Sequence, residues 1–331
     1  MSKEQILAIL KQNAGSYCSG EIIRQQLGIS RAAVSKAVAA LRQEGYVISA
    51  ITNRGYCLEE SPDRLTEGTI RPWLHSTVLG TGDRLICLDS IDSTNNYLKR
   101  LAVEGALDGT VAVADQQTAG RGRLGRSFQS PPGTGIYISF LLRPDLLPNR
   151  AMNLTACTAV AVCDAVERAC GMRPQIKWTN DVLMNKRKLC GILTEMSVEG
   201  ETGSLQYIVV GIGVNVNQNL EDFPSELQNI AGSVAMATGK KMDRGRLTAE
   251  LINAMDEMYA AWQTGHWDVD RYRADCATIG REVRVIRGSS ERNAFAETVD
   301  DDFALVVRYE DGTRETVFSG EVSVRGLEGY V

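Results

Sequence analysis

The sequence predicts an α+β protein of three domains: a helical module with a hairpin, a mixed α/β domain and a small all-β domain. Three observations predict this class. The chain has 331 residues, which is more than one small core usually organises. Residues 1–62 change from a helical to a hairpin pattern, and short, evenly spaced strand patterns begin at residue 279. We therefore expect domains at 1–62, 63–275 and 276–331.

Composition narrows the class of protein. Hydrophobic residues make up 44% of the chain and charged residues 23%, as in soluble globular proteins. No run of about eighteen apolar residues occurs, so we expect no membrane partner. The polar N-terminus lacks the apolar core of a signal peptide, which favours a cytoplasmic location. Taken alone, the net charge of −5 argues against a nucleic-acid partner.

Cysteine and histidine are poorly placed for metal or nucleophilic chemistry. The eight cysteines include no Cys-x-x-Cys pair, and the two histidines are His75 and His266. This spacing does not provide the clustered ligands of a structural zinc site. Disulfides are not expected without a secretion signal. We expect scattered, mostly buried thiols in a reducing cytoplasm, and few places for Ser/His or Cys/His catalysis.

Residues 1–62 have the pattern of a winged helix-turn-helix. Three helices are expected, with Ser19 and Ser30 as N-caps of the second and third. Gly28 provides the tight turn between them, and a hairpin turning near Arg54 follows. One apolar stripe marks the buried face of the third helix: Val34, Ala37, Val38 and Leu41.

This module predicts DNA binding, with the third helix in a major groove. Seven Lys/Arg against five Asp/Glu give residues 1–62 a charge of +2. So small a charge predicts modest affinity for a monomer, so dimerisation would help. The alternative is a helical bundle with an ordinary solvated face. The candidate DNA-binding residues are Arg31, Ser35, Lys36 and Arg42 on the third helix and Arg54 at the wing tip.

The central domain opens with a strand at 85–88 that runs into a helix. Ser93, Thr94 and Asn95 stand at this junction, where short polar side chains cap a helix or bind a polar ligand. Capping alone is the simpler interpretation of these residues in isolation.

A second strand, at 110–114, leads to Gln117 and a loop rich in glycine and arginine. The loop contains G-x-G-x-x-G at residues 120–125, but a strand follows instead of a helix, so we reject a dinucleotide-binding fold. Glycine lets a backbone close around a ligand, and arginine supplies forked donors for phosphate or carboxylate. We interpret residues 120–126, here called the lid, as a mobile anion-closing loop; the alternative is a solvated basic loop.

Three further segments complete the candidate site. Residues 176–184 read as one strand with charged and amide groups, followed by a hairpin over 185–195. Lys188 stands beside the buried strand of that hairpin, where a lysine stabilises charge developing at an α-phosphate. Asn215 or Asn217, in and just after a glycine-rich strand, could read an adenine edge; glycine packing in a sheet is the alternative.

Short strands from residue 279 suggest a small SH3-like barrel. We expect strands at 283–286, 293–299, 305–309, 316–318 and 321–324. Seven Lys/Arg against eleven Asp/Glu give residues 276–331 a charge of −4. A stabilising cap is the simplest role for such a domain.

Together these motifs resemble the biotin–protein ligase family, most closely the bifunctional type that also represses the biotin operon. The resemblance covers essentially the whole chain and implies a class II synthetase-like central domain. Thr179 stands where the family usually has proline, which would fix the turn before Asn180 and Asp181. We expect retained chemistry with a slightly looser turn. The motifs occur in the family's order: 93–95, Gln117 with 120–126, 177–181, 187–193 and 211–215.

The resemblance implies two half-reactions. Biotin and ATP give biotinyl-5′-AMP and pyrophosphate with Mg²⁺, whose ligands are not identified. A lysine of a biotin carboxyl carrier protein then takes the biotinyl group. It also implies binding to operator DNA of biotin genes and a homodimer when biotinyl-AMP is bound. The C-terminal domain would assist nucleotide binding and carrier docking.

The resemblance also assigns roles by residue. Biotin would contact Ser93, Thr94, Asn95, Gln117, Arg121, Gly122, Arg123 and Lys188. The adenylate would contact Arg121, Arg123, Lys188 and Asn215. Lys188, Arg123 and Asp181 would be catalytic, and we hypothesise that Asp181 is the base or orienter for the attacking lysine, whose ordinary pKa is about 10.4.

Three alternatives remain open at this point. One is a lipoate- or octanoate-handling ligase on a related fold, although the lid and residues 177–181 favour biotin. Another is a regulator that senses biotin without catalysis, against which intact Arg123 and Lys188 argue. The third is a ligase whose N-terminal domain does not bind DNA.

Overall fold

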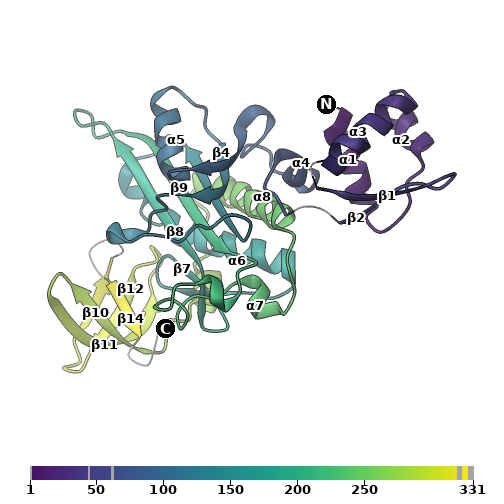
Figure 1. The fold of residues 1–331 in the computed structure, drawn as a ribbon. Helices are drawn as coiled ribbons and strands as arrows, with labels where there is room; N and C mark the ends of the chain where they lie inside the picture. The colour runs from purple at the N-terminus through teal and green to yellow at the C-terminus, as the bar shows by residue number, and fades with distance from the viewer. Residues whose placement is uncertain (1, 44, 61–62, 319–322, 327–331) are drawn as a thin grey trace.

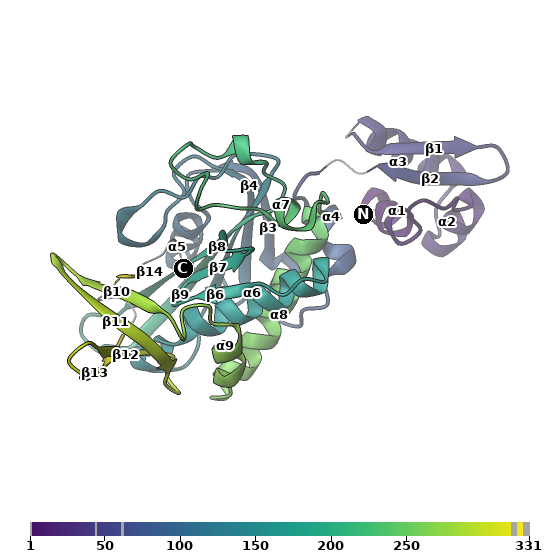
Figure 2. The ribbon, with the colours of Figure 1, turned by 90° about the horizontal axis from the view of Figure 1, so that it is seen from below.

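The computed structural model describes residues 2–43, 45–60, 63–318 and 323–326. The N-terminal domain is separated in space from the C-terminal one, and the two flank the central domain at opposite ends (Figures 1 and 2). Within the described residues, no helix combines the length and apolar character needed to cross a membrane.

The N-terminal domain has three helices and a two-stranded hairpin, as predicted. Ser19 caps the second helix, and Gly28 ends it with φ of 64°. Ser30 accepts a hydrogen bond from the backbone N–H of Ala33. The predicted stripe of the third helix is buried. The elements are α1 (Ser2–Gln12), α2 (Gly20–Leu27), α3 (Arg31–Gln43), β1 (Val47–Ile51) and β2 (Gly55–Glu60).

The central domain is built on a seven-stranded sheet of order β3-β4-β5-β9-β8-β7-β6. Only the β3–β4 pair is parallel among the strand pairs described in this sheet. The strands are β3 (Leu85–Ile91), β4 (Thr110–Gln117), β5 (Gly135–Leu142), β6 (Gln175–Lys177), β7 (Asp181–Met184), β8 (Arg187–Val198) and β9 (Leu205–Asn215).

Helices cover both faces of this sheet. On one face, α5 (Thr94–Val103) packs Leu98 and Ala102 against Ala112 and Leu141. The other face joins the larger core with α6 (Leu154–Cys170) and α8 (Arg244–Gln263), which lie side by side (Figure 2). Successive strand residues point to opposite faces, and because both faces are covered, every residue of β5 is buried. The remaining helices are α4 (Glu67–Ile70), α7 (Val234–Thr238) and α9 (Val269–Asp275).

One predicted strand is wrong. Residues 176–184 form two antiparallel strands, β6 and β7, instead of one. Lys177 pairs with Asp181, so the chain reverses at residues 178–180, where the Trp178–Thr179 peptide bond is cis. Apolar residues on both sides of the turn hide the break from a pattern-based prediction.

The C-terminal domain is an antiparallel sheet of order β13-β12-β11-β10-β14. Within the described residues β13 and β14 remain at opposite edges, so the predicted SH3-like barrel closure is not seen. The predicted strand 321–324 lies partly outside the described residues. The strands are β10 (Glu282–Arg287), β11 (Ser290–Val299), β12 (Leu305–Tyr309), β13 (Arg314–Val317) and β14 (Ser323–Gly326).

The N-terminal domain touches the central domain through α1. A Cβ added to Gly68 of α4 would lie 3.3 Å from the Leu7 side chain, so the two helices pack closely. Lys11, at the end of α1, is buried, and burial lowers the pKa of its ammonium while Asp243 acts in the opposite direction. The junction therefore contains a buried charge as well as apolar contacts.

Candidate active site

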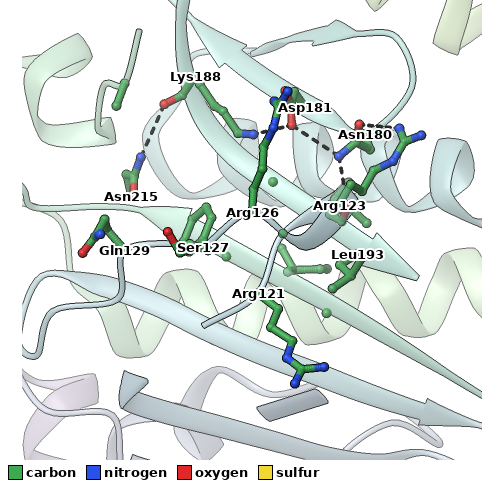
Figure 3. Close-up of a pocket in the computed structure, with 18 of the residues that line it drawn as sticks. Arg121, Arg123, Arg126, Ser127, Gln129, Asn180, Asp181, Lys188, Leu193 and Asn215 are labelled. Carbon is green, nitrogen blue, oxygen red and sulfur yellow. Dashed lines mark hydrogen bonds and ion pairs between the residues drawn. The ribbon is translucent and has the colours of Figure 1, made fainter. Parts of the chain in front are cut away.

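A cavity of about 750 Å³ lies where the lid meets the sheet of the central domain (Figure 3). Its walls come from the start of α5, the lid and the residues after it, the hairpins of β6 to β9, residues 223–231 and Arg284 of the C-terminal sheet. All ten central-domain residues named from the sequence as candidate site residues line this cavity: Ser93, Thr94, Asn95, Gln117, Arg121, Gly122, Arg123, Asp181, Lys188 and Asn215. The buried Lys177 lines it as well.

One end of the cavity is polar and uncharged. Ser93 is the N-cap of α5, which directs the following side chains toward the sheet. The carboxamide oxygen of Gln117 accepts hydrogen bonds from the backbone N–H and the hydroxyl of Thr94, at 2.9 and 3.1 Å. Its amide donates to the Ser130 hydroxyl at 3.0 Å. Capping and ligand presentation are therefore compatible in these residues.

Asn95 is held from three sides. Its amide donates to the carboxylate of Glu195 at 2.8 Å and to the carbonyl of Leu193 at 3.3 Å. The Ser139 hydroxyl donates to its oxygen at 2.6 Å. Burial alone would raise the pKa of Glu195, but hydrogen bonds from Lys99 and Asn95 lower it below its ordinary value. The carboxylate therefore stays ionised and fixes the Asn95 amide.

The lid is ordered by its own backbone. Gly122 donates to the carbonyl of Arg126, and Phe128 donates to that of Gly120. Arg123 points back toward the hairpin turn and donates to the Asn180 oxygen at 2.9 Å. Burial lowers the pKa of the Arg123 guanidinium, an effect that Asp181 opposes. Arg121 instead extends away from Lys188 and Asp181 (Figure 3).

The cationic part of the cavity centres on Lys188. Its ammonium lies 2.6 Å from a carboxylate oxygen of Asp181 (Figure 3). Its backbone N–H donates to the Ile230 carbonyl, and its carbonyl accepts from the Gly232 N–H. These hydrogen bonds bring residues 223–231 to the cavity wall. Asn215 is buried and donates to the Gly232 carbonyl at 3.1 Å and the Lys188 carbonyl at 3.4 Å. In this structure its amide therefore also braces the segment around Lys188.

Several lining residues were not named from the sequence. Phe128 lies over Gly213, where an added Cβ would be 2.5 Å from the ring. Trp178 donates its indole N–H to the Phe303 carbonyl at 2.8 Å, which ties the C-terminal domain to the cavity. Arg284 and residues 223–231 carry no local signal, because distant segments bring them to the site. Phe128 does have a local signal, because it is an aromatic residue only two positions after the lid.

The candidate DNA-binding residues lie on one module. Arg31, Ser35 and Lys36 are exposed on α3, and Arg54 is exposed in the turn between β1 and β2. Arg42 is also exposed, but its guanidinium donates to the Ile48 carbonyl of β1 at 2.8 Å. Arg42 thus braces the helix against the hairpin in this structure.

Three family models match the three parts of the chain. The model of an HTH domain matches residues 2–57, that of the biotin/lipoate A/B protein ligase family matches 87–215, and that of the biotin protein ligase C-terminal domain matches 278–325. These ranges follow the N-terminal module, the cavity-bearing sheet and the C-terminal sheet in turn.

Relatives extend over nearly the full length. A bifunctional ligase/repressor BirA from Bacillus spizizenii is 35% identical over 97% of this chain and 98% of its own. The protein of that name from Escherichia coli is 31% identical over 98% and 97%. A solved biotin protein ligase from Aquifex aeolicus, in complex with biotin and ATP, aligns with a TM-score of 0.63 and 30% identity over 73% of this chain and 98% of that one. The chain therefore belongs to the biotin protein ligase family, in its bifunctional ligase/repressor type.

Proposed function

We propose that this protein joins biotin to a biotin carboxyl carrier protein through biotinyl-5′-AMP, and that it represses biotin genes by binding their operator DNA. One observation supports the ligase function above others. A single continuous cavity has uncharged hydrogen-bonding groups from α5 and β4 at one end and Arg123 and Lys188 at the other. A ligand with a neutral polar head and an anionic tail matches this division.

The neutral end suits the ureido ring of biotin. A ureido group offers two N–H donors and one carbonyl acceptor, and Thr94, Asn95 and Gln117 supply both kinds of partner. The glycines Gly211 and Gly213 leave room for the ring system, because any side chain there would meet Asn95 or Phe128. Binding at this end directs the carboxylate of biotin toward Arg123 and Lys188.

At the charged end, the carboxylate oxygen of biotin attacks the α-phosphorus of ATP. The bond from that phosphorus to the bridging oxygen breaks, and pyrophosphate leaves. Lys188 and Arg123 stabilise the negative charge that develops on the α-phosphate. The ammonium of Lys188 is held ready by Asp181, which fixes its position without a covalent step.

The lid protects the product. An acyl-adenylate hydrolyses readily, so a loop that excludes water increases its lifetime. Arg121 and Gly122 complete the cover over the anhydride, and Asn215 contacts the adenine. We place Arg284 at the nucleotide end, as the contribution of the C-terminal domain.

Mg²⁺ would bind mainly through the phosphates of ATP. Magnesium commonly uses one or two carboxylates, substrate phosphates and water. Asp181 is the carboxylate among the described residues that line the cavity, so the donor set fits this mode. Mg²⁺ would neutralise phosphate charge there.

In the second half-reaction the amine of a carrier lysine attacks the biotinyl carbonyl and AMP leaves. The amine must first lose a proton, and we assign Asp181 to accept or orient it. Asp181 pairs with Lys188, so the nucleotide phosphate must first bind Lys188 in its place before Asp181 can act.

We also propose a dimer of the adenylate-bound protein, a cytoplasmic location and an SH3-like form for the C-terminal domain.

Mass measurement of a carrier domain tests the ligase function. Incubation with ATP, Mg²⁺ and biotin should add one biotinyl group, whereas lipoate or octanoate should add nothing. Lys188→Ala should lower the rate of adenylate formation at least 100-fold, because it removes charge stabilisation. Lys186→Ala, in the neighbouring turn, is the matched control and should retain the wild-type rate.

Three results would contradict the assignment. Acylation by lipoate but not biotin would indicate the related ligase activity, and an unchanged Lys188→Ala rate would remove that residue from the chemistry. For Asp181→Asn, we expect adenylate to form while transfer to the carrier slows. Unchanged transfer would show that Asp181 is not the base or orienter.

A further inference from the structure

A fully buried arginine stands outside the cavity and joins three distant segments. Arg244, at the start of α8, donates from Nε to a carboxylate oxygen of Asp63 at 2.6 Å and from a second nitrogen to the Asp63 carbonyl. Its remaining terminal nitrogen donates to Asp115 and to the carbonyl of Gly135, both at 2.8 Å. Two carboxylates thus share one buried guanidinium.

Two of these partners belong to the stems of the lid. Asp115 lies in β4, two residues before Gln117, and Gly135 begins β5 on the return path. The other oxygen of Asp115 accepts a hydrogen bond from the backbone N–H of Gly133 at 3.2 Å. Arg244 and Asp115 therefore hold the entering and leaving strands of the lid together.

The third partner belongs to the connection between domains. Asp63 is the first described residue after β2, the last strand of the N-terminal module. Its second carboxylate oxygen accepts from the amide of Asn217 at 3.0 Å. Asn217 follows Asn215 by two residues, and its backbone N–H donates to the Thr134 carbonyl in the returning stem at 2.8 Å. Asp63 is therefore connected to the returning stem both through Asn217 and through Arg244.

We propose that Arg244 is a positioning residue that couples the lid to the attachment of the N-terminal domain through Asp63. A bound adenylate that fixes the lid also fixes Asp115 and residues 133–135, and these hold Arg244 in the geometry that grips Asp63. The inference rests on the proposed function, since the ligand is biotinyl-AMP and the output is DNA binding.

Thermodynamic linkage makes the coupling reciprocal. If bound adenylate strengthens the interaction between Arg244 and Asp63, then weakening that interaction must lower the affinity for the adenylate by the same factor. Because the guanidinium is buried, loss of one carboxylate charge is not masked by water. Asp63 does not line the cavity, but substitution of Asp63 should thus change the rate at which the adenylate dissociates.

Asp63→Asn in the full-length protein tests this coupling. The substitution keeps the shape and an oxygen acceptor but removes the charge. Two quantities should be measured: the rate at which bound biotinyl-AMP dissociates, and the ratio of operator-DNA affinities with and without biotin and ATP. Glu59→Gln, an exposed acid at the end of β2, is the matched control because it changes the charge near the same junction equally.

We expect Asp63→Asn to release the adenylate about five-fold faster and to reduce the ligand-dependent DNA ratio about five-fold. Asp115→Asn should speed release as well, and Glu59→Gln should change neither quantity. Thermal unfolding establishes that each variant is folded, and Asp63→Glu provides a second variant that retains the charge and should be closer to wild type.

The proposal fails if folded Asp63→Asn releases adenylate at the wild-type rate, or if it weakens DNA binding equally with and without ligand. The second result would show that Asp63 only orients the N-terminal domain. If wild-type protein shows no ligand-dependent DNA binding, the repressor function fails instead, while the adenylate release rate still decides whether Asp63 is coupled to the lid.

Discussion

At the scale of single residues, the biotin end of the cavity depends on two glycines, because they carry no side chain that would fill it. Gly211 and Gly213 face the site from β9, and Asn95 and Phe128 occupy the space that a Cβ would need. At Gly211 that Cβ would lie 2.2 Å from the Asn95 oxygen. Because Asn95 is also fixed by Glu195 and Ser139, it cannot move aside without breaking hydrogen bonds.

Gly211→Ala should therefore weaken biotin binding. Overpacking of a well-filled site costs about 1–3 kcal/mol, which corresponds to a KM for biotin raised roughly 5-fold to 150-fold. Gly200→Ala is the control, because the space around that position is open and its backbone needs no left-handed conformation. Steady-state kinetics at saturating ATP measures the effect. Equal KM values for the two variants would show that Asn95 does not position biotin.

The local motifs could be predicted at this scale because each places several functional residues within a few positions. Residues 93–95, Gln117 and Lys188 carry their chemistry in their own segments, and the structure brings them to one cavity. Arg244 could not be identified in this way. Its partners are distant in sequence, and an arginine at the start of a helix ordinarily indicates a solvated side chain.

At the scale of elements, α5 is tied to the strand before it by a charge pair. Both terminal nitrogens of Arg100 donate to the carboxylate of Asp92, at 2.9 and 3.0 Å. The Asp92 carbonyl accepts from Ala119, just before the lid. This pair therefore anchors both the N-terminal end of α5 and the approach to the lid.

The pair predicts a pH dependence of stability. Hydrogen bonds from Arg100 hold the pKa of Asp92 well below its usual range. A carboxyl group whose pKa is depressed by folding stabilises the native state above its unfolded pKa of about 3.9, and this stabilisation is lost as the pH falls. Asp92→Asn should therefore lower the melting temperature at pH 7 and show a smaller further decrease toward pH 3.

Thermal unfolding at several pH values checks this expectation. The effect should be modest, because both side chains are partly exposed and surface ion pairs contribute little. Asp89→Asn, at an exposed position in the strand that ends just before Asp92, should follow the wild-type pH profile. A profile of Asp92→Asn parallel to that of wild type would contradict the role of the pair.

Elements were predictable where the pattern was long and regular. The stripe of α3 follows from helical periodicity, whereas β3, β4 and β5 of the central sheet follow from short apolar runs. The turn at residues 178–180 was missed because apolar residues continue on both sides of it. The order of the seven strands was not predictable, since it depends on pairings such as β5 with β9 that are distant in sequence.

At the scale of the whole molecule, charge is divided between domains. The net charge of −5 resolves into +2 for residues 1–62, −3 for the centre and −4 from residue 276. Figures 1 and 2 place the acidic C-terminal sheet at the far end from the N-terminal module. The basic surface of the module is therefore separated from the acidic domain, but its few cations give one copy limited affinity for DNA.

This arrangement predicts that the salt dependence of operator binding reports pairing. Each phosphate contact contributes about 0.9 to the slope of log affinity against log salt concentration. Arg54→Ala removes one contact per copy, so the slope should decrease by about 1 without ligand and by about 2 when adenylate pairs two copies. Arg64→Ala, an exposed arginine at the start of the central domain, should leave both slopes unchanged.

Gel shifts on the biotin-gene upstream DNA of the host, at several salt concentrations and with and without biotin and ATP, measure these slopes. A decrease of about 1 under both conditions would show that a single copy binds whether or not ligand is present. Arg54→Ala slopes equal to those of wild type would remove the wing tip from the interface. A decrease that doubles with ligand requires two wings on one DNA, because a single copy carries only one Arg54.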